Sequence, residues 1–252
     1  MNEFSNKPCA AYVHPRLAAT YDAINPAEGD YDFYVRLAGD KPLAILDMGS
    51  GTGRLSLKLA ARGHRVTGAD PAPGMMLAAR AKPGAEAVTW VAGDAASLAL
   101  ATRFDLIVMT GHVFQVFLED DDIRAALSNL RRHLAPGGRI AFETRNPAVR
   151  EWESWTPALT REQIAVPDIG PVTVHYDMTG ADDRFVRFDT HFDFGDGDKV
   201  VAPTTLRIMD QATLARLLAE SGLKPLDWFG DWDHSPFRPD SPEIIVVASA
   251  AS

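Results

Sequence analysis

The chain of 252 residues has one cysteine, Cys9, and no long run of apolar residues. One thiol cannot form an internal disulfide, hold a structural zinc ion by itself or supply the paired thiols of a redox motif, so we expect Cys9 to be an unreactive surface thiol. No apolar stretch approaches the roughly 20 residues that a membrane helix needs. The first residues have neither a basic start nor a continuous apolar stretch, so no secretory signal is visible. These absences predict a cytoplasmic protein that does not cross a membrane.

Clusters of lysine and arginine are also missing, and the formal net charge is -9 at pH 7. A surface of this sign repels a phosphate backbone, which disfavours nucleic acid as a partner without excluding it. The composition, 46% hydrophobic and 23% charged, is typical of a soluble globular protein, and 252 residues suffice for one sizeable core. We therefore expect a single domain and a small-molecule substrate, while the oligomeric state is left open.

Between residues 41 and 147, apolar runs of strand length alternate with helical patterns. This alternation is typical of βαβ units and predicts an α/β fold with a parallel sheet, whose strands are buried on both faces. An acidic run, residues 119–122, precedes the last helical pattern and is expected to cap that helix and to complement its dipole. The runs, in chain order, are Leu43 to Met48, Leu55 to Arg62, Arg65 to Ala69, Gly74 to Ala81, Val88 to Ala92, Leu106 to Met109, Ile123 to Leu134 and Arg139 to Thr144.

The segments on either side follow different patterns. Residues 15–38 carry aromatic side chains interrupted by proline and glycine, which predicts two short helices in an N-terminal helical cap. Polar and apolar side chains alternate within 172–178 and within 186–194, a period of two that predicts half-buried antiparallel strands. Together with a third strand over 200–209, they would form a small inserted lid.

Beyond residue 209 the chain returns to the α/β pattern. Asp210 is expected to cap a helix that runs to about Ser221 and is ended by Gly222. Strands near 226–229 and 244–248 would then complete the main sheet.

One segment, residues 45–53 with the sequence ILDMGSGTG, joins an apolar strand to a glycine turn and then to a helix. Glycines at alternate positions keep side chains out of the turn, so that backbone N–H groups can approach a ligand near the positive end of the helix dipole. A dinucleotide fingerprint requires glycine or alanine where Arg54 stands, and Gly53 comes one residue early. The turn therefore disfavours a pyrophosphate.

Asp47 followed by GSGTG resembles the first motif of the class I S-adenosylmethionine-dependent methyltransferases, an acidic residue followed by G-x-G-x-G. The resemblance covers residues 41–147, with weaker similarity over 207–249. Further segments match the family in order, and they are RVTGAD (65–70), DPAPGMML (70–77), VAGD (91–94), FDLIVM (104–109) and LAPGGRIAF (134–142).

The resemblance implies a Rossmann-like, doubly wound, mostly parallel seven-stranded sheet whose last strand is antiparallel. It also implies S-adenosyl-L-methionine as the cofactor and S-adenosyl-L-homocysteine as the product. We expect residues 1–252 to form one methyltransferase domain. Its predicted parts are an N-terminal helical cap (1–40), a cofactor-binding core (41–147), an inserted antiparallel lid (148–209) and a C-terminal completion of the sheet (210–252).

The same resemblance implies roles for acidic residues at the ends of strands. Asp70 matches the residue that accepts hydrogen bonds from both ribose hydroxyls, although an NAD enzyme would use the same carboxylate. Asp94 matches the residue that binds the adenine amino group, with the backbone N–H of Ala95 facing the ring. Asp47 would bind the amino group of the methionine portion directly or through water. Each acid by itself would be interpreted as a helix cap or turn residue, and their order along the chain favours a cofactor site.

Other positions complete the implied cofactor site. Pro71 and Met75 match residues that pack on adenine, although a core role suits Met75 almost as well. The remaining residues are Gly49, Ser50, Gly51 and Gly53 in the turn, and Thr110 and Gly111 beside the methionine portion.

His112 and Gln115, which follow the fourth strand, are the candidate catalytic residues. Histidine serves as a general base near neutral pH but also fills many structural roles. Trp152 and Trp155 either wall the substrate cavity or anchor the lid. Methyl transfer from a sulfonium depends on alignment and on exclusion of water, so it requires no nucleophile on the protein, and we expect no metal site.

The sequence therefore predicts an S-adenosylmethionine-dependent methyltransferase that acts on a small-molecule acceptor. One alternative is a nicotinamide-dependent oxidoreductase, against which Arg54 and Asp94 argue. Another is a non-catalytic protein that binds the cofactor and regulates a partner. A nucleic-acid methyltransferase is disfavoured because TGHVF (110–114) stands where amino-directed base enzymes carry Asn-Pro-Pro-aromatic, and Cys9 is poorly placed as a nucleophile. The sequence does not name the acceptor or say whether oxygen, nitrogen or carbon is methylated.

Overall fold

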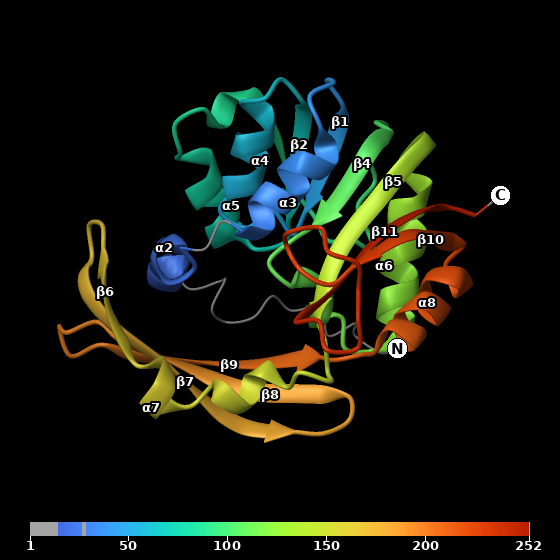
Figure 1. Ribbon diagram of the computed structural model, residues 1–252. Helices are drawn as coiled ribbons and strands as arrows, with labels where there is room; N and C mark the ends of the chain where they lie inside the picture. The colour runs from blue at the N-terminus through green and yellow to red at the C-terminus, as the bar shows by residue number, and fades with distance from the viewer. Residues whose placement is uncertain (1–14, 27–28, 252) are drawn as a thin grey trace, which may run out of the picture.

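The computed structural model describes residues 15–26 and 29–251, so Cys9 lies outside the described residues. A seven-stranded sheet forms the centre of the molecule (Figure 1). In sheet order its strands are β10 (Leu223–Phe229), β11 (Glu243–Ala250), β5 (Leu134–Arg145), β4 (Phe104–Met109), β1 (Ala44–Met48), β2 (Arg65–Asp70) and β3 (Val88–Ala92).

The strand directions confirm the predicted fold class. The pairs β1–β2, β1–β4, β2–β3 and β4–β5 are parallel, whereas β11 runs antiparallel to both β5 and β10. The last strand of the chain is thus the antiparallel one. This is the Rossmann-like, doubly wound arrangement that the alternating pattern and the resemblance implied.

Helices cover both faces of this sheet because its central strands are apolar on both sides. Alternate residues of β1 point in opposite directions, so that Ile45 and Leu46 belong to two different buried clusters. The helices are α3 (Gly29–Ala38), α4 (Arg54–Ala60), α5 (Pro73–Arg80), α6 (Asp120–Arg132) and α8 (Gln211–Glu220), with 3-10 turns η1 (Ala85–Ala87) and η2 (Val113–Val116).

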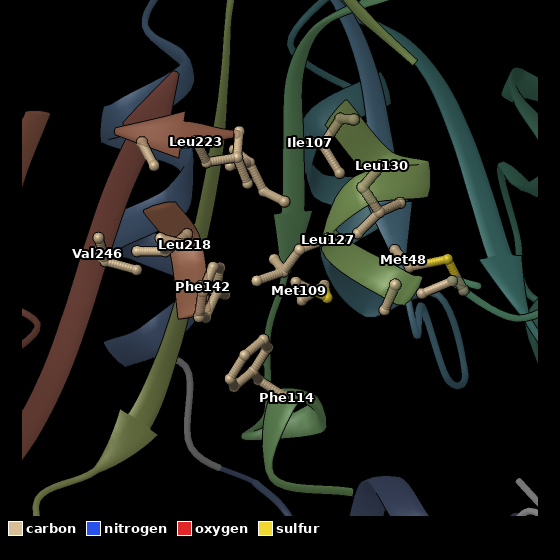
Figure 2. Close-up of a cluster of buried hydrophobic side chains, with 14 of the residues drawn as sticks. Met48, Ile107, Met109, Phe114, Leu127, Leu130, Phe142, Leu218, Leu223 and Val246 are labelled. Atoms are coloured by element: carbon tan, nitrogen blue, oxygen red, sulfur yellow. The ribbon is translucent and has the colours of Figure 1, made fainter. Parts of the chain in front are cut away.

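Figure 2 shows the cluster between the sheet and helices α6 and α8. Leu127 of α6 and Leu218 of α8 are buried there beside Met109 and Phe142 of neighbouring strands. On the opposite face, Phe33 of α3 packs in the second cluster. The burial of apolar side chains on both faces holds the sheet rigidly and fixes where its strand ends lie.

The ends of two helices were predicted, with different outcomes. Asp210 caps α8, since its carboxylate accepts the N–H of Thr213 at 2.8 Å, and Gly222 ends that helix with φ of 73°. At α6 the predicted capping hydrogen bond is absent, because the side chain of Glu119 does not accept an N–H of the first turn. Asp120 instead pairs with the guanidinium of Arg207.

A separate antiparallel sheet is inserted between β5 and α8. Its strands, in order, are β6 (Glu162–Val166), β7 (Gly170–Ala181), β8 (Phe185–Asp193) and β9 (Lys199–Arg207). Three strands were predicted, and β6 is the additional one. Its exposed and buried side chains do not alternate strictly, which is why the period-two pattern missed it.

The inserted sheet lies beyond the carboxyl ends of β4 and β5, and α2 (Pro15–Ile24) lies between it and α5 (Figure 1). Leu17 of α2 packs on Val174 and Phe192 of the sheet. The segment that enters the sheet forms η3 (Glu151–Ser154) and α7 (Pro157–Thr160). Within residues 15–26 and 29–251, no helix combines the length and apolar character required to cross a bilayer.

Candidate active site

Three acidic residues singled out in the sequence lie at one edge of the main sheet. Strands β1, β2 and β3 are neighbours, and Asp70 at the end of β2 pairs in register with Ala92 at the end of β3. Because parallel strands end on the same side, Asp47, Asp70 and Asp94 all lie at the carboxyl edge. The N–H of Gly93 also donates to the carbonyl of Asp70, at 3.2 Å. The fold therefore gathers acids that are far apart in the sequence.

The glycine turn between β1 and α4 is held against β2. The N–H groups of Gly49 and Ser50 both donate to the carbonyl of Ala69, at 2.8 and 3.0 Å. The N–H of Gly51 donates to Asp70 Oδ2 at 2.9 Å. These bonds fix the turn next to the carboxylate that follows β2.

Glycine is required in this turn for two different reasons. Gly49, Gly51 and Gly53 have φ of 76°, 52° and 80°, values that residues with a side chain adopt at a cost. A Cβ at Gly49 would lie 2.5 Å from Val113 Cγ2, and one at Gly53 would lie 2.4 Å from the ring of Trp90. A Cβ at Gly51 would meet no atom within 4 Å. The outer glycines therefore serve packing, and the central one borders open space.

Asp70 and Asp94 accept hydrogen bonds from the turns that follow their strands. Asp70 Oδ1 accepts the N–H of Ala72 at 2.8 Å, while Asp94 Oδ1 accepts those of Ala96 and Ser97 at 2.9 and 3.0 Å. Burial raises the pKa of Asp70, and its two backbone hydrogen bonds act in the opposite sense. Both carboxylates are thus oriented by local backbone before any ligand binds.

Asp47 is buried beneath the turn. Its Oδ2 accepts a hydrogen bond from Ser56 Oγ at 2.6 Å. Burial raises the pKa of Asp47 to about 6, although the bond from Ser56 lowers it. Nearby in the chain, Ser50 Oγ is buried and has no hydrogen-bond partner among the described residues. An unpaired buried hydroxyl in a glycine turn indicates a position that a polar ligand group can satisfy.

The residues expected against adenine differ in exposure. Met75 is buried and packs with Ala18 and Ala72 beside Tyr21, so it is part of the core between α2 and α5. Pro71 is exposed. Ala95, after β3, is buried, and its carbonyl accepts a hydrogen bond from Asn129 at 2.9 Å.

Helix α2 closes over the glycine turn. Thr52 Oγ1 donates to Asp22 Oδ1 at 2.5 Å. The hydroxyl of Tyr21 lies 3.8 Å from where a Cβ at Gly111 would stand, on the loop after β4. Burial raises the pKa of Tyr21 to about 12, and the charges of Asp70, Asp22 and others add to the effect. Tyr21 therefore spans from α5 to the loop that carries Thr110 and Gly111.

His112 is the centre of a second group of polar side chains. Its backbone N–H donates to Glu143 Oε1 of β5 at 2.7 Å, and the hydroxyl of Tyr34 in α3 donates to the other oxygen of that carboxyl group. His112 Nε2 lies 2.9 and 3.0 Å from the two carboxyl oxygens of Glu243, the first residue of β11. His112 has φ of 57°, so the loop holds it in the left-handed region. Groups from α3, β5 and β11 thus meet around His112, and Glu243 binds its imidazole directly.

Burial dominates the protonation of this group. It raises the pKa of Glu143 to about 7 and that of Glu243 to about 8, and it lowers the pKa of His112 to about 4. The charge of Arg145 lowers the pKa of His112 further. Near neutral pH, His112 is therefore neutral, and Glu243 holds a proton that it can donate to Nε2 of the ring.

Gln115 has both ends of its amide engaged within the protein. Its Nε2 donates to the carbonyl of Arg207 in β9 at 3.0 Å, and its Oε1 accepts from Arg145 of β5 at 2.9 Å. The side chain is fully buried. In this structure Gln115 therefore ties the inserted sheet to the main sheet.

Trp152 and Trp155 anchor the inserted sheet. Both are buried, in a cluster with Val186 and Phe188 of β8. The guanidinium of Arg145 lies 5.0 Å from the ring centroid of Trp155. Of the two interpretations of these tryptophans, the contacts correspond to anchoring.

Sequence reasoning missed several residues of the site. Glu143 and Glu243 are acids within strands that otherwise consist largely of apolar residues, a signal that was available in AFET and EIIVV. Tyr21, Asp30 and Tyr34 belong to the predicted helical cap, but nothing in their local pattern indicates that they reach the strand ends.

Comparisons with known proteins agree with this arrangement. Residues 45–138 match a family model described as a methyltransferase domain. The chain is 34% identical over 145 residues, 57% of its length, to malonyl-[acyl-carrier protein] O-methyltransferase of Serratia marcescens, of which the match covers 55%. It thus spans about half the length of the curated relatives that it matches.

Solved structures show the same fold over nearly the whole chain. The CcbJ methyltransferase from Streptomyces caelestis superposes with a TM-score of 0.79 at 22% identity, covering 96% of this chain and 98% of that one. The sugar N-methyltransferase KedS8 from Streptoalloteichus superposes with a TM-score of 0.68 at 18% identity, covering 90% and 87%. By the family model, residues 45–138 form a methyltransferase domain, and the fold of the whole chain is that of the solved methyltransferases.

Proposed function

We propose that this protein transfers a methyl group from S-adenosyl-L-methionine to a small-molecule acceptor and releases S-adenosyl-L-homocysteine. The observation that carries the proposal is the gathering of Asp47, the glycine turn, Asp70 and Asp94 at one carboxyl edge, within the segment that matches a methyltransferase domain. Ligands of open α/β sheets bind at this edge.

The residues present fit such a cofactor. The unpaired Ser50 Oγ and the open space at Gly51 leave a polar, uncrowded surface on the turn. Asp70 is oriented to accept the ribose hydroxyls, and Asp94 with the N–H of Ala95 to bind the adenine amino group. Asp47 binds the methionine amino group, directly or through water.

Further residues complete the proposed cofactor site. Pro71, which is exposed, contacts the adenine ring, whereas Met75 keeps its core position between α2 and α5. Gly49, Gly53, Thr110 and Gly111 shape the backbone around the remainder of the cofactor. When bound, the cofactor supplies an electrophilic methyl group whose sulfonium charge is neutralised during transfer. The chain contributes alignment of the acceptor and exclusion of water, with α2 and the inserted sheet as covers.

A small-molecule acceptor is supported by the half-buried position of His112 and by the acidic net charge, which opposes binding to nucleic acid. One relative is named as a malonyl-[acyl-carrier protein] O-methyltransferase and one solved structure as a sugar N-methyltransferase, and both names are consistent with a small acceptor group. We further propose a cytoplasmic location, supported by the single cysteine and by the composition.

Calorimetric titration tests the cofactor. We expect S-adenosyl-L-homocysteine to bind the purified protein and NADH not to bind. Binding of NADH without binding of S-adenosyl-L-homocysteine would replace the proposal with a nicotinamide-dependent oxidoreductase.

Transfer of label tests the activity. The protein is incubated with methyl-labelled S-adenosyl-L-methionine and a cell extract separated into small molecules, proteins and nucleic acids. We expect label in the small-molecule fraction. Cofactor binding without label in any fraction would indicate a non-catalytic regulator.

A further inference from the structure

Carboxyl groups surround His112 from almost every side. The charged and titratable groups that act on it are Asp30 and Tyr34 of α3, Glu143 and Arg145 of β5, Glu243 of β11 and Glu151 of η3. The nearby cation, Arg145, is already engaged, because it pairs with Glu151 at 2.9 Å and donates to Gln115 at 2.9 Å. The acceptor side of the site therefore contains more carboxyl groups than cationic groups.

Asp30 belongs to this group of acids, and the charge of Arg54 acts on its carboxyl group. Its Oδ1 accepts the backbone N–H of Tyr31 at 2.8 Å, and among the described residues it forms no ion pair. The side chain is half-buried, and burial raises its pKa. Asp30 lies one helical turn before Tyr34 on α3, and the hydroxyl of Tyr34 binds the same Glu143 carboxyl group that accepts the backbone N–H of His112, so Asp30 lies on the side of the helix that faces this group. A partly desolvated carboxylate of this kind is stabilised by a cation.

His112 has one ring nitrogen fixed and one available. Nε2 is held by both oxygens of Glu243. Nδ1 has no hydrogen-bond partner among the described residues. It is also absent from the fully buried polar atoms that lack a partner, so a ligand can reach it. A carboxylate that holds one nitrogen orients the ring and stabilises the imidazolium that forms when the other nitrogen takes up a proton.

We propose that the acceptor is an amine, bound as its ammonium ion beside Asp30, that His112 takes the ammonium proton at Nδ1, and that Glu243 is a positioning residue for His112. This inference rests on the function proposed above and narrows its substrate class. An N–H bond of the ammonium ion breaks, and its electron pair stays on nitrogen. The step occurs when Glu243 is ionised and the ring proton of neutral His112 is on Nε2, which leaves the lone pair of Nδ1 free. The ammonium proton binds Nδ1, and the resulting imidazolium donates its Nε2–H to the Glu243 carboxylate.

The chemistry favours an amine over an alcohol. An ammonium ion has a pKa of about 8 to 10, within reach of an imidazole, whereas an alcohol gives up its proton far less readily. A neutral alcohol also gains little from an unpaired carboxylate, and an anionic acceptor is repelled by it.

The first experiment compares two ligands by calorimetry on the wild type and on Asp30→Asn. Sinefungin carries an amine where the cofactor carries its transferable methyl group, and S-adenosyl-L-homocysteine carries none. We expect Asp30→Asn to weaken sinefungin binding about 10- to 100-fold, the loss of one charge-assisted contact. The affinity for S-adenosyl-L-homocysteine should change less than twofold.

The matched control is Asp32→Asn on the same helix, whose carboxylate lies at the surface and pairs with Lys58 at 3.2 Å. It should leave both affinities unchanged. If both ligands bind the wild type and Asp30→Asn alters neither, the amine proposal is wrong. If neither ligand binds the wild type, the proposed function itself fails.

The second experiment follows the His112 ring by nitrogen NMR in the complex with S-adenosyl-L-homocysteine. In the wild type we expect Nδ1 to become unprotonated as pH rises through about 8, when Glu243 loses its proton. Glu243→Gln should abolish that transition, while Glu151→Gln, which also lies near the pair, should retain it. An unchanged transition in Glu243→Gln would refute the positioning role.

The product provides a third readout. The labelled compound isolated with the wild type should carry its methyl group on nitrogen. A methyl group on oxygen or carbon would overturn the amine proposal while leaving methyl transfer intact.

Discussion

The two halves of the carboxyl edge are built in different ways. At β1, β2 and β3, each acid accepts hydrogen bonds from a nearby turn or from the helix that follows its strand, as Asp94 does from Ser97 and Asp47 from Ser56. At β4, β5 and β11, polar groups from distant parts of the chain satisfy one another, as His112 and Glu243 do across 131 positions. The first half is a set of local motifs that we propose to bind the cofactor, and the second is an assembly that we propose to bind the acceptor.

Asp70→Ala should impair cofactor binding at β1, β2 and β3 and leave the group around His112 intact. The carboxylate is expected to accept two ribose hydroxyls, and charged hydrogen bonds contribute about 1.5–3 kcal/mol each, so affinity for S-adenosyl-L-homocysteine should fall about 1,000-fold. Calorimetry measures the change. Asp105→Ala is the matched control, because that carboxylate accepts the N–H of Ala44 at 2.8 Å, at the beginning of β1 rather than at its carboxyl end. Unchanged affinity in Asp70→Ala would remove the ribose assignment.

Two glycine substitutions should separate packing from ligand approach within the first half. Gly53→Ala places a Cβ against Trp90 and should lower the free energy of unfolding by about 3 kcal/mol, from backbone strain and overpacking together. Gly51→Ala meets no atom and should cost about 1 kcal/mol, yet weaken cofactor binding. Thermal denaturation and titration distinguish the two. Equal losses of stability in the two variants would show that Gly51 and Gly53 do not differ in their contribution to packing.

The second half should respond to pH through Glu143. In the unfolded chain this carboxyl group ionises near pH 4.5, whereas in the folded protein burial raises its pKa to about 7. Between these values the folded state binds more protons, so the free energy of unfolding should fall as pH rises from about 4.5 to 7, by about 3 kcal/mol at most. Glu143→Gln should flatten this dependence in denaturant titrations. The exposed Glu153→Gln should keep it, and a wild-type profile that rises across the window would contradict the assignment.

Gln115→Leu should loosen the connection between the two sheets. It leaves the carbonyl of Arg207 and one N–H of Arg145 without their partner, which should cost about 1–2 kcal/mol of stability. If Gln115 positions the inserted sheet, the variant should raise the KM for the acceptor more than it lowers kcat. Gln163→Leu, on the exposed part of β6, is the control. A loss confined to kcat would restore Gln115 as a catalytic residue.

Much of the first half could be predicted because its signals are local. The glycine turn, the acid after β2 and the acid after β3 each lie within a few residues of an apolar run, and parallel strands bring their ends together. The same logic predicted the antiparallel last strand and the cap at Asp210. It failed at Glu119, whose carboxylate pairs with the distant Arg184 at 3.2 Å instead of capping the helix.

The second half could not be predicted in the same way. Glu143 and Glu243 are visible as acids in apolar strands, but their shared neighbour His112 is defined only by the pairing of β5 with β11. Asp30 and Tyr34 lie on one helix among other polar residues, and its packing on the sheet decides which of them faces the site.

The sequence by itself determined the α/β fold, the cofactor edge and the candidate histidine, because hydrophobic period, glycine conformation and strand-end acids act over short stretches of chain. Only the tertiary structure decided which groups surround that histidine. Their protonation depends on burial and on charges brought together by packing, and neither quantity is written in any local segment of the chain.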